Sequence, residues 1–264
     1  YKLKAIFFIT GLMAEKLTKH PKILELLKNH EIGFHSSSHS VRPVIPEYTD
    51  VKSYRKAYLI SKKRETAHIN PLTGKIEREG GLYSLKDLFN HRKIEIYRAP
   101  GMCWTPPHLE ALADLGIKYD FSSNISTSEP FRYRGIIFYP YTFTQKWDGS
   151  LYDYECLFAA ILKRKVAVLD IHPTLFVNQT MWDNIFYKGN PKKLYRSRKR
   201  PLKETISLFK KFESLLKYVT LLYHMKLIDV NPDLNIKPKD LVINRCMVEK
   251  CYETSMRWPI RWFN

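Results

Sequence analysis

Residues 30–39 read His-Glu-Ile-Gly-Phe-His-Ser-Ser-Ser-His, a short apolar run followed at once by two histidines. The run 31–34 predicts a short strand, and His35 and His39 lie just past its carboxyl end. On a helical turn, this spacing places both imidazoles on one face, where their nitrogens can converge on one divalent metal. The alternative is a chance pair on a solvated face. Because strand ends carry the chemistry in barrels and doubly wound sheets, the segment indicates a site of that kind.

Strand and helix patterns alternate along the chain. The first apolar run, residues 4–10, is typical of a strand buried on both faces. The other predicted strands are residues 31–34, 94–98, 116–120, 135–139 and 165–171. Amphipathic patterns predict helices at residues 12–18, 21–28, 83–90, 106–115, 152–163 and 202–222. The alternation predicts an α/β fold with a mainly parallel sheet.

Polar residues follow several of these strands. Arg98 ends one of them, Asp120 ends the next, and His172 follows the strand at 165–171. Each has a structural alternative: an ion pair for Arg98, a turn or cap for Asp120, and a hydrogen-bonded core position for His172.

Residues 51–81 look like an excursion inserted between core elements. Its charged helical stretch, 51–68, leads to turns rich in Gly and Pro. We find no chemistry in it beyond Glu65 and His68, which are expected at the surface.

Composition predicts one large domain with an extension. The chain has 264 residues, of which 44% are hydrophobic, which is enough for a substantial core. We assign residues 1–230 to the α/β domain and residues 231–264 to an irregular C-terminal extension. The aromatic, basic end of that extension suggests an interfacial anchor or docking on the domain surface.

The charge balance is strongly basic. Lys and Arg number 44 against 26 acids, a net charge of +18, which favours anionic partners such as phosphate-bearing polymers, acidic glycans or lipid head groups. The alternative is that the excess is spread over solvated faces. The run 196–200, Arg-Ser-Arg-Lys-Arg, is more typical of a solvated loop before a helix than of a nucleic-acid patch.

Other sequence signals are few. The four cysteines are too scattered for a disulfide scaffold or a zinc knuckle, although Cys246 and Cys251 could pair. No apolar run approaches the roughly 20 residues that span a bilayer. No targeting signal is visible in a chain that opens on Tyr1, so the sequence does not fix a localisation.

Taken together, the motifs resemble the polysaccharide deacetylase family, also called the NodB-homology or carbohydrate esterase family four group. They occur in the family's order and span most of the chain to about Leu216. The matching segments are Ala5-Ile-Phe-Phe-Ile-Thr-Gly11, residues 30–39, Tyr97-Arg-Ala-Pro-Gly101, the helix and strand at 109–120, and Val168-Leu-Asp-Ile-His-Pro173.

The resemblance implies a deformed, incomplete (β/α) barrel and metal-dependent hydrolysis of an N-acyl group. By analogy, His35 and His39 are ligands of a divalent ion, usually zinc, sometimes cobalt or nickel. Arg98 corresponds to the arginine that orients the catalytic carboxylate, and His172 to the general acid on the leaving amine. The substrate would be an N-acetylated glycan or a small amide. The substrate-binding residues by the same analogy are Pro100, Gly101, Trp104 and Leu169, with Asp120 matching a position in the wall of the site less securely.

The chain departs from the family at its first motif, two adjacent aspartates that supply a third ligand and the catalytic base. Only Tyr1-Lys-Leu-Lys4 precedes the first strand, and it holds no aspartate. We therefore expect either a clipped form of an active enzyme, with its first strand missing, or a variant without a base. In either case we expect impaired hydrolysis. A catalytically silent carbohydrate-binding or scaffold protein is the alternative function, and nucleic-acid binding is a weaker one.

Overall fold

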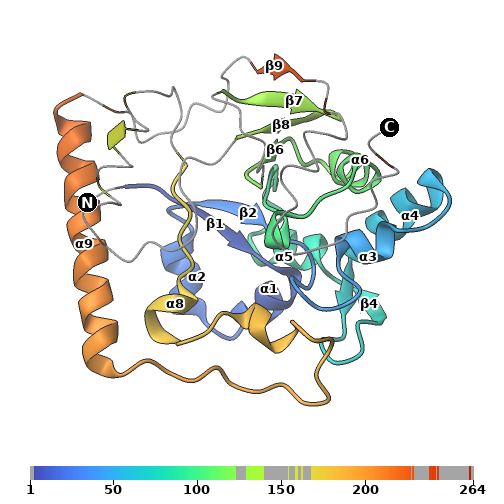
Figure 1. The fold of residues 1–264 in the computed structure, drawn as a ribbon, viewed down its shortest axis with the longest axis horizontal. Coiled ribbons are helices and arrows are strands. Elements are labelled where there is room, and N and C mark those ends of the chain that lie inside the picture. Colours follow the sequence, from blue (N-terminus) through green and yellow to red (C-terminus); the bar gives the residue numbers. More distant parts are fainter. Residues whose placement is uncertain are drawn as a thin grey trace.

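The computed structural model describes residues 3–122, 129–139 and 168–226, together with residues 154, 158, 159, 162, 228, 238–241, 243 and 262. Within them one main sheet is combined with helices in a mixed α/β arrangement (Figure 1). The α/β class predicted from the alternating pattern is confirmed.

The main sheet has seven strands in the order β1-β2-β5-β6-β8-β7-β9. These are β1 (Ile6–Ile9), β2 (Glu31–Phe34), β5 (Ile96–Tyr97), β6 (Tyr119–Asp120), β8 (Ile136–Phe138), β7 (Phe131–Tyr133) and β9 (Lys239–Asp240). The pairs from β1 to β8 are parallel, and β7 is antiparallel to β8. The described strands form an open sheet with β1 and β9 at its edges, so the mainly parallel sheet is as predicted, whereas a barrel is not shown.

Most of the helices are short, and α9 (Leu202–His224) is the longest among the described residues. The α-helices are α1 (Gly11–Leu17), α2 (Pro21–Leu27), α3 (Ile45–Thr49), α4 (Tyr54–Glu65), α5 (Leu82–Leu88), α6 (Pro106–Asp114), α8 (Thr174–Val177) and α9 (Leu202–His224), and the 3₁₀ turns are η1 (Pro100–Met102) and η2 (Trp182–Ile185). Local chemistry explains where several of these helices begin. The Thr10 hydroxyl accepts the Met13 N–H at 3.1 Å and caps α1, and Pro21 occupies the first turn of α2.

The predicted excursion forms a unit of its own beside the sheet. It contains α4 and a two-stranded antiparallel hairpin, β3 (Ala67–Ile69) with β4 (Ile76–Glu79). Helix α4 packs against α6, which brings the end of α4 toward the main domain.

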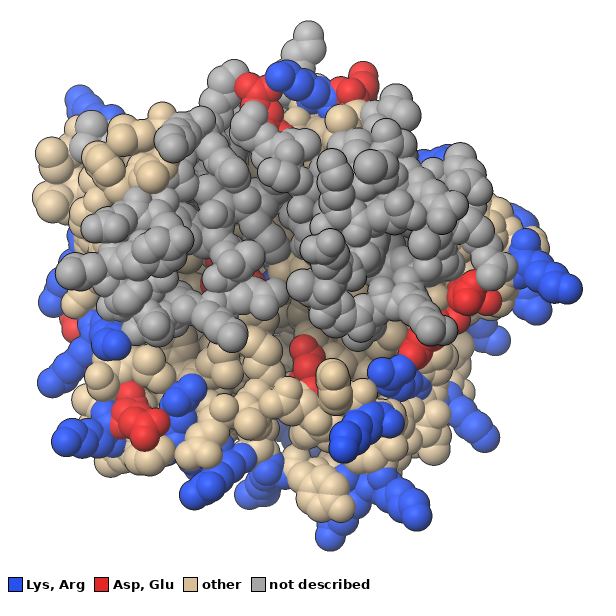
Figure 2. Space-filling view, in the orientation of Figure 1, with Lys and Arg blue, Asp and Glu red and all other residues tan. Residues whose placement is uncertain are grey.

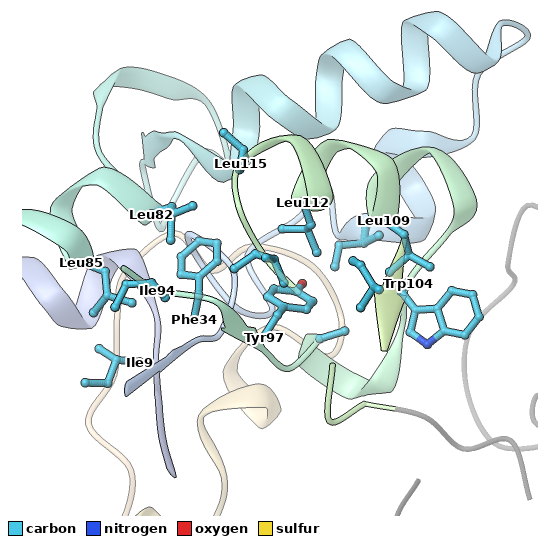
Figure 3. Packing of buried hydrophobic residues seen from close by; sticks show 14 of the residues in the cluster. Ile9, Phe34, Leu82, Leu85, Ile94, Tyr97, Trp104, Leu109, Leu112 and Leu115 are labelled. Atoms are coloured by element: carbon cyan, nitrogen blue, oxygen red, sulfur yellow. The ribbon is translucent and has the colours of Figure 1, made fainter. Parts of the chain in front are cut away.

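Alternate residues of the strands face two apolar clusters. Phe7 and Ile9 of β1 lie against the larger cluster, whereas Ile6 and Phe8 lie against the smaller one, as the two-residue period of a strand requires. Figure 3 shows leucines of α5 and α6 packing over Phe34 and Tyr97 in the larger cluster. Strand β1 itself is less buried than its sequence predicted, since Ile6, Phe7 and Phe8 are only half-buried.

The predicted strand at 165–171 is not seen in its described part. Residues 168–171 belong to no strand or helix, and residues 163–167 lie outside the described residues. Val168 packs on the smaller apolar cluster, while the Asp170 carboxylate pairs with Arg98. Side-chain contacts therefore hold this segment against the sheet, although its apolar composition predicted a strand with backbone hydrogen bonds to a neighbour.

Parts of the predicted C-terminal extension lie against the domain. Strand β9 pairs with β7 in parallel, and Ile243 is buried in the larger cluster. The Trp262 indole N–H donates to the Thr49 carbonyl at 3.0 Å. Of residues 231–264, the structure describes only 238–241, 243 and 262.

Basic side chains are spread around the face shown in Figure 2, with acidic residues among them. The run 196–200 lies in a largely exposed loop before α9, as predicted from its sequence. No helix among the described residues has the length and apolarity needed to cross a bilayer.

Candidate active site

The candidate site lies at one edge of the main sheet, where three neighbouring parallel strands end. His35 follows β2, Arg98 follows β5, and Asp120 is the last residue of β6. Because these strands are parallel, their carboxyl ends meet at the same edge. The register pairs Phe34 with Tyr97 and Tyr97 with Asp120, so His35 and Arg98 lie one residue beyond the level of Asp120 at this edge.

His35 and His39 are close together, but not for the reason that their spacing suggested. The residues after β2 form a loop and not a helical turn, and Ser36 (φ 61°) and His39 (φ 56°) both adopt left-handed backbone conformations. This sharp path brings the two imidazole centroids within 4.6 Å at an interplanar angle of 71°. The expectation of a helical face was wrong, while the expected proximity of the rings is found.

The Nδ1 atom of each imidazole has a protein partner. His35 Nδ1 lies 2.6 Å from the Arg98 carbonyl oxygen, so that nitrogen carries the proton and donates it. Burial lowers the pKa of His35 well below its usual value, and the positive charges of His39 and Arg98 add to the shift. His35 is therefore a neutral imidazole whose Nε2 keeps its lone pair.

His39 is oriented by a carboxylate. Its Nδ1 lies 2.7 Å from Asp183 Oδ1 and 2.6 Å from the Ser40 hydroxyl, which itself donates to Asp183. Burial raises the pKa of Asp183, but the hydrogen bond and charge of His39 outweigh burial and hold that pKa below its usual value. A carboxylate on Nδ1 leaves Nε2 available, which is the arrangement usual around metal-binding histidines.

A buried ion pair connects Arg98 to His172. The Arg98 guanidinium donates to Asp170 Oδ2 at 2.6 Å, with 9% and 7% of the two side chains exposed. The same Asp170 oxygen lies 3.6 Å from His172 Nδ1, which is an ion-pair distance and too long for a hydrogen bond. Burial lowers the pKa of His172, and although Asp170 opposes this effect, the net shift is downward.

The donor set for a metal is partial. Two imidazoles fit a divalent ion by chemistry and by the engagement of both Nδ1 atoms. Among the described residues, however, no group of three or more His, Cys, Asp or Glu side chains is arranged to hold one. His35 and His39 would therefore be two ligands of a site whose third protein donor the described residues do not supply.

The predicted substrate-binding residues occupy different environments. Pro100 is buried and Gly101 is exposed in the turn η1 after β5, where Gly101 has a φ of 58°. Leu169 is half-buried next to Asp170. Trp104 lies in the core, where its ring packs on Phe138 and Tyr133 at centroid distances of 5.1 and 5.9 Å.

Asp120 makes the turn that was one of its two sequence interpretations. Its Oδ1 accepts the Ser122 N–H at 2.6 Å and also the Ser122 hydroxyl. Burial raises the pKa of Asp120 to about 7, although the Ser122 hydrogen bonds and the nearby Arg98 act in the opposite direction.

Two acidic residues belong to the site region although no role was predicted for them. Asp183 orients His39, and Glu65, which was expected at the surface, is 1% exposed and bonded to the loop between the histidines. No local pattern marks either of them: Asp183 lies in the short 3₁₀ turn η2, and Glu65 ends a helix rich in exposed charge. Only tertiary contacts identify them.

Comparisons with known proteins give little support of their own. No protein-family model matches the chain, and no curated protein sequence matches it. A crystal structure from Mycobacterium smegmatis, described as a "putative polysaccharide deacetylase", is similar at 15% sequence identity and a TM-score of 0.36. The similarity covers 61% of this chain and 54% of that one, so it spans about half of the length of that protein.

Proposed function

We propose that this chain is a metal-dependent hydrolase of N-acyl amides, of the polysaccharide deacetylase type, acting on an N-acetylated glycan or a related small amide. The observation that carries the proposal is the continuous series of contacts from His39 through His35, Arg98 and Asp170 to His172. These residues come from segments far apart in the sequence. These contacts gather imidazole, carboxylate and guanidinium groups at one sheet edge, where acid–base chemistry needs them within reach of one substrate.

His35 and His39 are the residues that we propose to hold the ion, with zinc first and cobalt or nickel as alternatives. The Nε2 atoms of both rings are left to bind an ion because their Nδ1 atoms are engaged by the Arg98 carbonyl and by Asp183. A bound ion would polarise an amide carbonyl and lower the pKa of a water molecule.

His172 is the proposed proton donor to the leaving amine. Because its pKa is lowered, the imidazole is neutral near pH 7 and must take up the proton of the attacking water before it passes that proton to the amine nitrogen. Asp170 lies beside Nδ1, where it would stabilise the intermediate imidazolium, and Arg98 holds the Asp170 side chain in place. Pro100, Gly101, Trp104 and Leu169 would shape the wall of the acyl site, Trp104 from within the core.

The test is acetate release from N-acetylated chito-oligosaccharides by the zinc-loaded chain. We expect slow release that stops after chelation and falls at least tenfold in His172→Asn and in His35→Ala. His20→Asn, at an exposed histidine outside the site, is the matched control and should keep the wild-type rate. Equal release by the His172 variant and the control would refute the assignment.

A silent carbohydrate-binding protein is the second candidate, and one observation favours it. The described residues offer no third metal donor beside the two imidazoles. This function predicts saturable oligosaccharide binding with no acetate released at any zinc concentration. Calorimetric titration of the same oligosaccharides, run alongside the acetate assay, distinguishes the two functions.

A further inference from the structure

The loop between His35 and His39 is held from two sides. On one side, the first backbone N–H groups of α1 donate to it: Gly11 N–H to the Ser36 carbonyl at 3.1 Å and Leu12 N–H to the Ser37 carbonyl at 2.9 Å. Helix N-termini have N–H groups to spare, so this side needs no special side chain.

On the other side stands a single buried carboxylate, Glu65 at the end of α4. Its Oε2 accepts the Ser37 N–H at 3.1 Å, and its Oε1 accepts the Ser36 hydroxyl at 3.0 Å. Glu65 is itself fixed, because Oε1 also lies 2.9 Å from His108 Nε2 and accepts the Tyr48 hydroxyl at 3.3 Å. The neighbouring Ser37 hydroxyl donates to the Arg64 carbonyl at 2.7 Å, so the end of α4 makes three contacts with the loop.

These contacts act on a strained segment. Ser36 has a φ of 61°, a conformation that costs about 1 kcal/mol or more for a residue other than glycine. Such a conformation persists only where surrounding bonds impose it. The segment Ser36–Ser38 also borders a small pocket whose lining includes Glu65 and His39, so apolar packing alone does not fix its path.

We propose that Glu65 is a positioning residue for the two-histidine site: its carboxylate sets the path of residues 36–38 and thereby brings the His35 and His39 imidazoles together. The effect of Glu65 on the path of the loop follows from the contacts described above. Only the expected effect on metal affinity rests on the proposed function. The excursion at 51–81 then has a role, because it supplies this carboxylate to the site.

The test compares Glu65→Gln with Glu79→Gln, a change at an exposed glutamate of the same excursion. The glutamine keeps the volume of Glu65 and an oxygen for the Ser37 N–H, but it removes the charge and places an NH₂ group where Oε1 accepts. The Ser36 and Tyr48 hydroxyls and His108 Nε2 then lose a charged acceptor and would have to accept instead of donate. In the metal-free chain we expect Glu65→Gln to abolish the nuclear Overhauser contact between the two imidazoles. Amide exchange at Ser37 should rise at least tenfold, while exchange at the core residue Leu112 stays within twofold.

Metal binding gives the second readout, by competition with a chromogenic chelator. We expect the zinc dissociation constant to rise about tenfold or more in Glu65→Gln and to stay unchanged in Glu79→Gln. Ser36→Ala removes one hydroxyl contact and should change Ser37 exchange and zinc affinity in the same direction by smaller amounts. This variant replaces Glu65→Gln in both measurements if Glu65→Gln does not fold.

Each outcome decides the matter. Loss of the ring contact while Leu112 exchange is unchanged supports the positioning role, whether or not the wild type binds zinc. A wild type that binds no zinc then counts against the proposed function alone. An unchanged ring contact and unchanged Ser37 exchange overturn the inference. So does a parallel rise of exchange at Ser37 and Leu112, since that pattern belongs to a residue that only stabilises the fold.

Discussion

The two segments that build the candidate site are held in different ways. The loop that carries His35 and His39 is fixed mainly through its backbone, by the N-terminus of α1 and by Glu65. The segment that carries Asp170, His172 and Asp183 is mostly irregular, and side-chain ion pairs with Arg98 and His39 tie it to the sheet edge.

This difference predicts which kind of substitution destabilises each segment. Backbone hydrogen bonds in a tight space are sensitive to added volume, because a close-packed loop has nowhere to move. A segment held by buried charges is sensitive to the loss of one partner, since the other charge then stays desolvated and unpaired. Substitutions of the two kinds should therefore have distinct signatures.

The largest expected effect is that of Gly81→Ala on the first segment. Gly81 has a φ of 58°, and a Cβ there would collide with the Ser37 hydroxyl and with the Glu65 carbonyl oxygen. Strain and overpacking together should lower the free energy of unfolding by about 4 kcal/mol. Urea denaturation measures it.

Gly116→Ala is the matched control for that substitution. Gly116 also has a positive φ, of 98°, but no atom lies within 4 Å of the position that its Cβ would take. We expect a loss of about 1 kcal/mol from strain alone. Equal losses for the two variants would mean that the loop is not closely packed.

Asp170→Asn should have the next largest effect and tests the second segment. It removes the charge that pairs with Arg98 at 2.6 Å in a pair that is less than a tenth exposed, so we expect the free energy of unfolding in urea to fall by about 3 kcal/mol. Glu31→Gln is the control, because the Arg92–Glu31 pair has nearly the same length, 2.7 Å, but is 36% and 43% exposed. Its loss should stay under about 1 kcal/mol, and similar losses at both pairs would contradict a buried tether.

Sequence patterns predict the parts of this molecule that depend on local periodicity. The runs 31–34 and 94–98 predict β2 and β5, and the polar residues after them predict where His35 and Arg98 lie. Sequence patterns do not predict the structure of segments whose conformation depends on tertiary contacts. Residues 168–171 have the composition of a strand, but whether a strand forms depends on a neighbour to pair with.

The site was predictable to a similar degree. The histidine pair and Arg98 follow from motifs at strand ends, whereas the rings meet through a left-handed loop that no periodicity encodes. Glu65 lies in a charged helix, where exposure was the natural expectation. Its burial depends on donors from Ser36, Ser37, Tyr48 and His108, which are distant in sequence.

Asp120 offers a smaller effect, opposite in sign, at the sheet edge between the two segments. Its pKa rises from 3.8 to about 7 on folding, so the folded chain binds more protons than the unfolded chain between those values, and the stability contribution of Asp120 falls as pH rises from about 4 to 7. Asp120→Asn should therefore raise the free energy of unfolding at pH 8 by about 2 kcal/mol. The whole pKa shift of Asp120 sets an upper limit of roughly 4 kcal/mol. At pH 4 the two chains should be equally stable, and a difference independent of pH would contradict the buried charge.

The smallest effect is expected where the two segments meet, at His39 and Asp183. Asp183→Asn keeps an acceptor for the His39 Nδ1–H but removes the charge that fixes that tautomer, so stability should change little while zinc affinity falls about tenfold. Asp87→Asn, at the exposed Asp87–His91 pair, is the matched control and should leave zinc affinity unchanged. Chelator competition measures both. If Asp183→Asn matched its control, the carboxylate would tether the second segment without orienting His39, and the two segments would be coupled only through Arg98.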